Sequence, residues 1–284
     1  MEKFEHQLAI VHWFNVLLGP LAQALHTAFG HPLTPDAHGN VIPPFMVMVI
    51  LIVLAFTVLG IVVRSRISVE NPGKLQVVFE DLIASIAAMM REWLGPDGAK
   101  YLPLIATLGA FILAGNYMGL IPGLISPTAS LNVTVGCAIT TWVFYHVQGF
   151  RAQGVGAYLM HFVFPPGVPK WLAPIMLPIE AISHLSRVLS LSLRLFGNIF
   201  GEETVIAILF YLVPFFIPLP MMLLGMITGG LQAFIFVLLS IIYLQGATHV
   251  AHEHDHGDPS HGREHGGHEH EHGDARDMAE MAAL

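Results

Sequence analysis

Residues 177–203 read LPIEAISHLSRVLSLSLRLFGNIFGEE, and this stretch decides how the rest of the chain is interpreted. It is strongly apolar, yet on a helix at about 100° per residue its charged and polar side chains fall within an arc of about 80°. This charged stripe consists of Glu180, His184, Arg187, Arg194, Asn198 and Glu202, and Ser183 and Ser190 widen it. Its length would be about 33 Å, close to the thickness of a bilayer core.

Ionisable groups on a membrane-length helix are costly, so the stripe is expected to line a polar path or to meet a charged partner. The alternative is a polar face that only holds helices together. Ser or Thr would do that without placing an arginine in the membrane, and we therefore favour the polar path.

The composition is that of an integral membrane protein. Of the 284 residues, 54% are hydrophobic and 11% are charged, whereas soluble domains carry about 25% charged residues. The net charge of −8 is unevenly placed, because nine of the 17 histidines and nine of the 20 acidic residues follow Thr248.

Several classes of function are excluded by what the sequence lacks. It has no basic patch for nucleic acid. Its single cysteine, Cys137, rules out an intrachain disulfide and a multi-cysteine metal site. It has no glycine-rich phosphate loop of the Walker type, so it does not bind ATP in that way. We expect no cofactor and no metal.

The first clear transmembrane helix is expected at residues 45–63. Arg64, Arg66 and Lys74 follow it directly. By the positive-inside rule this end is cytoplasmic, and residues 1–44 form an extracytoplasmic segment.

Four further segments complete the first half of the chain. Residues 8–30 fit an interfacial amphipathic helix or an irregular first span, and residues 73–94 an amphipathic helix on the cytoplasmic surface. Residues 101–122 and 131–146 predict a transmembrane hairpin. Asn116 in its first arm needs a partner, either in an interhelical hydrogen bond or in an ion path.

The second half begins with residues 154–169, which are too short and broken to span and should lie along the surface. The charged stripe belongs to a helix at residues 171–213, which must tilt strongly or bend because of its length. The last helix, residues 221–247, carries Gln232 on a face with two glycines, where another helix can approach closely. These two glycines are Gly225 and Gly229.

Residues 249–284 are a histidine-rich tract that cannot bury a core and is predicted to be disordered. Such a tract would bind metal loosely and without fixed geometry, so we expect a dispensable tail. Between the tail and the extracytoplasmic segment, residues 45–248 are predicted to form one membrane domain for ion translocation.

Four motifs carry a family resemblance: PIEAISHLSR (178–187), SLSLRLFGN (190–198), NYMGLIPGLISPTASLNVT (116–134) and GLQAFIFVLLSIIYL (230–244). They resemble subunit a of the F-type ATP synthase, the membrane stator subunit. The resemblance covers residues 45–244, and its most specific parts are the motifs around Arg194 and Gln232.

The resemblance implies a stator beside a rotating ring of small c-ring proteolipid subunits, each with a membrane-embedded carboxylate. Two offset half-channels would lead ions to and from the ring, with the proton as the expected ion and sodium as the alternative. It also implies b-type peripheral stalk subunits and membrane lipid as partners, the bacterial inner membrane as location, and a cytoplasmic C-terminal tail. The subunit would couple the gradient to ATP synthesis without a catalytic centre of its own.

By motif, Arg194 is similar to the essential arginine that faces the ring carboxylate, and Gln232 to the glutamine beside it. Asn198 and Glu203 match polar residues of the half-channel that opens to the outside. On the cytoplasmic side, the matching positions are Glu180 and Ser190. His184 fits either a relay or a hydrogen-bonded packing role.

The sequence departs from some bacterial members of the family at two positions. They have a small residue in place of Glu202 and a histidine in place of Gly225, as if the polar group had moved between helices. Glu203 lies about 100° from Glu202 on a helix, so both cannot point at Arg194, and either could carry the proton.

The residues support the same mechanism on physical grounds. Arginine stays charged at physiological pH and cannot relay protons, but it attracts a carboxylate and keeps it ionised. Glu, His, Asn, Gln and water can form relays on either side. A permanent cation between two offset paths forces the ion to travel on the moving partner.

We therefore predict an all-α polytopic membrane protein with transmembrane helices and long, strongly tilted helices packed against a proteolipid ring. One rival, a stand-alone secondary transporter, should show a repeat and a midplane helix break, and neither is visible. The other rival, a metal transporter, needs His or acidic pairs in several spans. Only His146 and His184 lie in the clear spans.

Overall fold

The computed structural model describes residues 9–28, 40–68, 73–121, 123–163, 173–212, 216 and 218–248. Within these ranges every regular element is a helix, and four helices are long and apolar enough to cross a membrane. The predicted all-α membrane architecture is confirmed. The tail at residues 249–284 lies outside the described residues.

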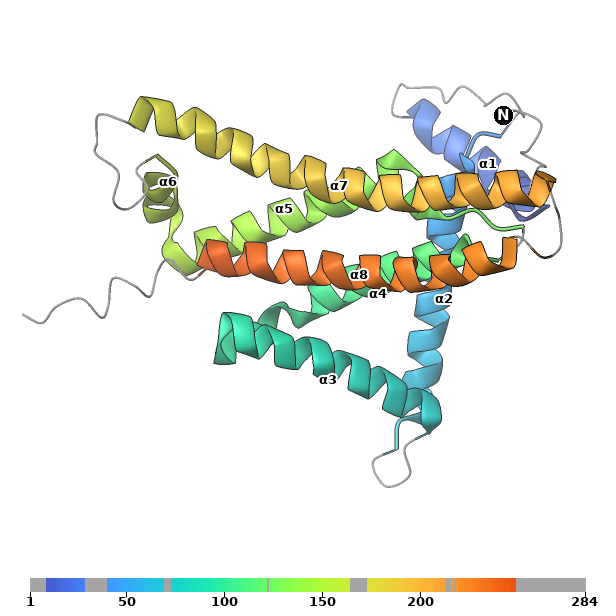
Figure 1. Ribbon diagram of the computed structural model, residues 1–284, viewed down its shortest axis with the longest axis horizontal. Coiled ribbons are helices and arrows are strands. Elements are labelled where there is room, and N and C mark those ends of the chain that lie inside the picture. Colours follow the sequence, from blue (N-terminus) through green and yellow to red (C-terminus); the bar gives the residue numbers. More distant parts are fainter. Residues whose placement is uncertain are drawn as a thin grey trace, which may run out of the picture. The chain divides into compact units, whose positions relative to one another are not determined.

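The helices follow the chain in the order shown in Figure 1. They are α1 (Ala9–Ala28), α2 (Pro44–Arg66), α3 (Lys74–Leu94), η1 (Pro96–Tyr101), α4 (Leu102–Met118), η2 (Pro127–Ala129), α5 (Leu131–Gln153), α6 (Val155–Val163), α7 (Ala173–Leu212) and α8 (Pro218–Thr248). Most bounds lie within a turn of the predicted ones. The largest difference is in α5, which continues two turns past residue 146 and ends at Gln153, capped by Gly154 with φ 80°.

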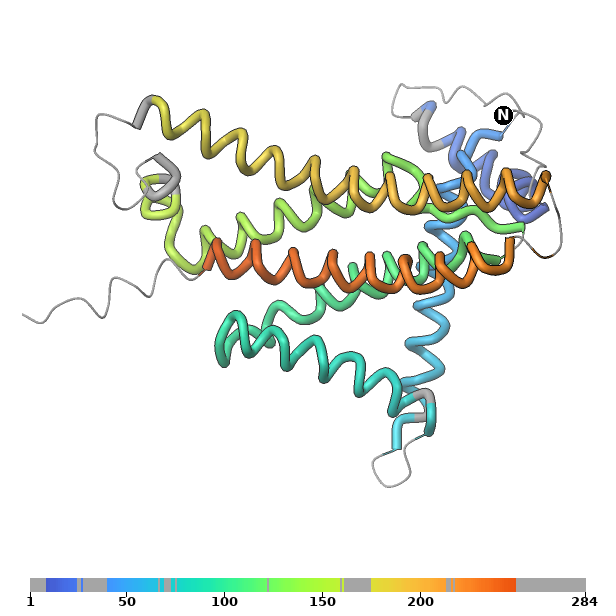
Figure 2. The backbone as a smooth tube through the Cα atoms, viewed as in Figure 1, coloured from blue at the N-terminus to red at the C-terminus, as the bar shows by residue number. Residues whose placement is uncertain are grey.

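The helices run in two main directions. In Figure 1, α2 crosses the direction followed by α7 and α8. Figure 2 shows α5 running between α7 and α8 in the same view, and α5 packs against both of them. The 40 residues of α7 correspond to about 60 Å, twice the thickness of a bilayer core. This length supports the predicted strong tilt.

One amide side chain connects α1 to the residues that precede α2. Asn15 of α1 accepts hydrogen bonds at Oδ1 from the backbone N–H groups of Val41 (3.0 Å) and Ile42 (2.8 Å). Its Nδ2 donates to the carbonyls of Val11 (3.0 Å) and Ile42 (3.1 Å). Asn15 therefore fixes α1 to the residues just before α2, and its polar atoms are satisfied without water.

The core sits where α4, α5, α7 and α8 meet. Ile112 of α4, Leu195 of α7 and Phe236 of α8 are fully or almost fully buried in one apolar cluster. The close fit of α4 against α8 depends on Gly109, because a Cβ atom there would lie 2.5 Å from Cγ2 of Val237. Gly109 thus allows the two helix backbones to approach, as small residues do in membrane bundles.

This contact predicts that a larger residue at position 109 destabilises the chain. Gly109→Ala should lower the free energy of unfolding of the detergent-purified chain by about 1–3 kcal/mol, because the added methyl group overlaps Val237. Val237→Ala in the same chain should recover part of that loss. Gly60→Ala is the control, since nothing lies within 4 Å of the added atom. A double variant that loses the full sum of its two single losses would contradict the contact.

Candidate functional site

The charged stripe of α7 is covered by the protein at its two ends and uncovered in the middle. Near one end His184 is buried, and near the other Glu202 is half-buried. Between them Ser190, Arg194 and Asn198 are exposed. The stripe therefore does not face a single neighbour along its length, and its centre is exposed.

The exposure of Arg194 follows from the packing of its neighbours. Leu191 and Leu195 are buried against α5 and α8, and this fixes which side of α7 faces the bundle. Arg194 lies outside that contact and makes no hydrogen bond or ion pair with any residue that the structure describes. Leu189 and Leu193, on the same stretch, are about half exposed at 50% and 54%. An arginine is thus presented among exposed leucines.

Gln232 of α8 is buried, with 4% of its surface exposed. Its Nε2 has no hydrogen-bond partner in the described part of the chain. No hydrogen bond joins Gln232 to Arg194. The structure therefore leaves an amide donor unsatisfied inside the bundle, beside the helix face that the glycines open.

Glu203 points towards the end of α4 and the loop that follows it. Its Oε1 accepts a hydrogen bond of 2.8 Å from the backbone N–H of Ser126. The carboxylate occupies the space that a side chain at Gly119 would need, since a Cβ atom there would overlap Oε1. Glu203 is thus seated by a backbone donor on one side and by a missing side chain on the other.

A continuous chain of hydrogen bonds leads from this loop to α8. Ser126 Oγ lies 2.6 Å from Thr128 Oγ1, and Thr128 Oγ1 donates to Asn116 Oδ1 at 2.7 Å. Asn116 Nδ2 then donates to the carbonyl of Gly229 at 2.9 Å. Because the single hydroxyl hydrogen of Thr128 is already used, Ser126 must be the donor to Thr128.

This chain of hydrogen bonds bears on the two interpretations of Asn116, an interhelical hydrogen bond or a role in an ion path. Asn116 does form an interhelical hydrogen bond, and it reaches α8 one turn before Gln232. The same bond also places Asn116 in a polar connection that ends at the residue binding Glu203. Ser126 and Thr128 were not singled out from the sequence, although both lie in the SPTASLN part of a quoted motif.

Glu202 takes a different direction from Glu203. Its Oε2 accepts a hydrogen bond of 2.9 Å from Thr228 Oγ1 on α8. A Cβ atom at Gly225 would overlap Glu202 Oε1. The carboxylate therefore fills the volume that a larger residue at position 225 would take, which explains why an acid and a glycine occur together here. The two adjacent acids diverge, as their positions on the helix predict.

At the other end of the stripe, His184 has both ring nitrogens engaged. Its Nδ1 lies 2.9 Å from the hydroxyl of Tyr145 on α5, and its Nε2 lies 3.3 Å from Glu180 Oε1. Arg187 is placed one turn further along, with its guanidinium 5.4 Å from the centre of the Tyr243 ring. Tyr145 was not predicted, because its contact with α7 joins residues far apart in sequence.

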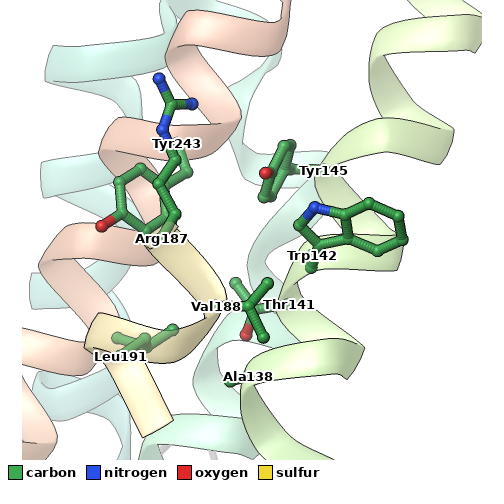
Figure 3. Close-up of a pocket in the computed structure, with 8 residues that line it drawn as sticks. All are labelled: Ala138, Thr141, Trp142, Tyr145, Arg187, Val188, Leu191 and Tyr243. Carbon is green, nitrogen blue, oxygen red and sulfur yellow. The ribbon is translucent and has the colours of Figure 1, made fainter. Parts of the chain in front are cut away.

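A narrow pocket between α5, α7 and α8 lies on the His184 side of Arg194. It is lined by Ala138, Thr141, Trp142, Tyr145, Arg187, Val188, Leu191 and Tyr243. Figure 3 shows Arg187 and Tyr243 on one side of it and Trp142 and Tyr145 on the other. The pocket places polar groups between the buried histidine and the uncovered centre of α7. Within the described ranges no group of three potential ligands could hold a metal ion.

Comparison with known proteins agrees with this geometry. The family model described as ATP synthase A chain matches residues 45–245. ATP synthase subunit a of Syntrophobacter fumaroxidans is 52% identical over 182 residues, which are 64% of this chain and 74% of that protein. ATP synthase subunit a 1 of Pelobacter propionicus is 41% identical over 247 residues, 87% of this chain and 99% of that protein.

A third relative, ATP synthase subunit a of Citrifermentans bemidjiense, is 46% identical over 202 residues, 71% of this chain and 86% of that protein. The matched region runs from the second residue of α2 to within three residues of the end of α8, and it includes both ends of the charged stripe. On the family match and the identity of these relatives, the chain belongs to the ATP synthase A chain family.

Proposed function

We propose that this chain is the ion-translocating stator subunit of a bacterial F-type ATP synthase, with Arg194 as the fixed cation between two half-channels. The observation that carries the proposal is the exposure of Arg194 at the centre of a stripe whose ends are covered. A charge at bilayer depth needs a partner, and no described residue of this chain supplies one. A carboxylate on a c-ring proteolipid would complete the pair.

In the proposed ATP synthase complex, other subunits and membrane lipid surround the chain. The c-ring covers the exposed face of α7, and b-type peripheral stalk subunits and membrane lipid meet the remaining apolar surface. The bacterial relatives support a location in the inner membrane. Under the positive-inside rule the end of α2 is cytoplasmic, and we propose that the C-terminal tail is cytoplasmic too. The subunit carries out no bond chemistry.

The inlet from outside is built by the two acids and their partners. Glu203 connects through Ser126 and Thr128 to Asn116, and Glu202 connects to α8 through Thr228. Carboxylates can take up and release protons, and hydroxyl and amide groups can pass them on with water. From these groups the proton would pass by Asn198, at the edge of the exposed centre of α7, and Gln232 of α8 to the ring carboxylate.

The exit towards the cytoplasm lies on the opposite side of Arg194. Ser190 is the first polar residue of the stripe on that side, and the pocket beside Arg187 follows. His184 and Glu180 then lead to the end of α7. Arg194 separates the two routes because a proton meets a permanent positive charge between them.

The strength of the pair explains why the ring has to move. At about 4 Å and an effective dielectric constant near 20, an arginine and a carboxylate attract each other by about 4 kcal/mol. A membrane potential of about 100 mV supplies roughly 2.3 kcal/mol per charge. The field alone does not separate the pair, so Arg194 is handed from one ring carboxylate to the next. A planar, weakly hydrated guanidinium suits this exchange better than an ammonium group.

Arg194→Ala and Arg194→Lys should both abolish ATP-driven proton pumping in membrane vesicles while the complex still assembles. The alanine variant should also leak protons, because the barrier between the half-channels is gone. Arg151→Ala, at the exposed end of α5, is the control and should pump normally. Normal pumping by an assembled Arg194→Ala complex would refute the assignment.

The two acids give a second test. Glu202→Gln and Glu203→Gln each keep an oxygen that can accept the observed hydrogen bond, but they remove the group that binds a proton. Each should slow proton flux in vesicles partially, and the double variant should be much slower than either. Glu92→Gln, on the exposed side of α3, should have no effect. Full-rate flux in both single variants and in the double variant would remove the pair from the path.

A further inference from the structure

A second histidine, His146 of α5, lies directly beside His184. The centres of the two rings are 4.8 Å apart, and their planes are inclined by 45°. Tyr158 of α6 holds His146 from the other side, with its hydroxyl 2.7 Å from His146 Nδ1. Neither His146 nor Tyr158 has a role in the path described so far.

The two histidines differ in how their nitrogens are used. Both nitrogens of His184 are engaged, one by Tyr145 and the other by Glu180. His146 uses only Nδ1, while its Nε2 is shielded from solvent and has no hydrogen-bond partner among the described residues. A buried polar nitrogen without a partner is costly, so it has a strong tendency to bind a donor or an acceptor.

Tyr158 makes His146 able to switch between these two states. Burial raises the pKa of the Tyr158 phenol, so it stays protonated and can rotate between donating and accepting. When Tyr158 accepts from Nδ1–H, the lone pair of His146 Nε2 is free to take a proton. The product is an imidazolium that still donates to Tyr158, and the same nitrogen returns the proton.

The surroundings limit the site to one added proton. The titratable and charged groups around the pair are Tyr145 of α5, Tyr158 of α6, Glu180 and Arg187 of α7, and Tyr243 of α8. Two imidazolium rings at this separation would repel each other. The cation of Arg187, on α7 with His184, adds to the repulsion. The single carboxylate of Glu180 offsets one positive charge.

We propose that His146 and His184 together form a two-histidine site that holds one proton at the cytoplasmic end of the path. His146 supplies the second proton-binding atom, Nε2, and Tyr158 positions it. The inference rests on the proposed function. In ATP-driven pumping the site would collect protons from the cytoplasm, and it would matter most where they are scarce.

The test is ATP-driven pumping by the full complex in inverted vesicles, in which the bath pH sets the cytoplasmic pH. His146→Asn keeps a polar group for Tyr158 but cannot bind a proton, and His146→Phe keeps the ring packing. Both should pump at close to the wild-type rate near pH 6 and about 3–10-fold slower near pH 8, where few protons are bound to an imidazole in solution. Tyr158→Phe should also slow pumping near pH 8, but by a smaller factor than the His146 variants.

The outcomes separate this proposal from the previous one. A wild-type pH profile in both His146 variants, or a loss that is equal at every pH, would overturn the two-histidine site. If either His146→Asn or His146→Phe pumps like the wild type at every pH, the role of His146 is structural and the proposal is overturned. Arg194→Ala in the same vesicles reports on the proposed function, because it should stop pumping at every pH. If His146→Phe assembles poorly, His146→Asn and Tyr158→Phe decide the question.

Discussion

A permanent positive charge in the middle of a membrane-length helix is the constraint on which the rest of the structure depends. Arg194 cannot lose its proton, and a charge at that depth needs a partner. The packing of Leu191 and Leu195 against α5 and α8 turns Arg194 out of the bundle, and in the proposed function its partner is a carboxylate of another subunit. Neighbouring residues cover the two ends of the charged stripe and leave its centre exposed. We propose that two ion paths meet at this centre and are kept apart there.

At the Glu202 end of the charged stripe, large side chains of one segment pack into the space left by glycines of another. Glu202 and Glu203 are adjacent, yet one carboxylate fills the space at Gly225 and the other the space at Gly119. Each acid then receives one hydrogen bond, from Thr228 and from the backbone of Ser126. Glycine at these positions allows polar groups to enter a close-packed membrane bundle without opening a large cavity.

Much of the fold could be predicted because it depends on periodicity and length. The bounds of α3, α7 and α8 and the close approach at Gly229 follow from residue spacing alone. What could not be predicted are contacts between residues distant in sequence. Thr128 is buried against Asn116 across a turn, and Tyr158 reaches His146 from a short helix that looked like a surface segment. Nor does a helical wheel show that the middle of the stripe is exposed, because exposure depends on where the neighbouring helices end.

The central claim is that Arg194 faces a ring carboxylate and not lipid or another part of this chain. The most direct measurement is a cryo-EM map of the assembled complex at a resolution that shows side chains. The account predicts the guanidinium of Arg194 within about 4–6 Å of one carboxylate of a c-ring subunit, the range in which opposite charges keep each other ionised. An Arg194 side chain covered by residues of its own subunit, or turned towards lipid with the ring on another face of α7, would contradict it.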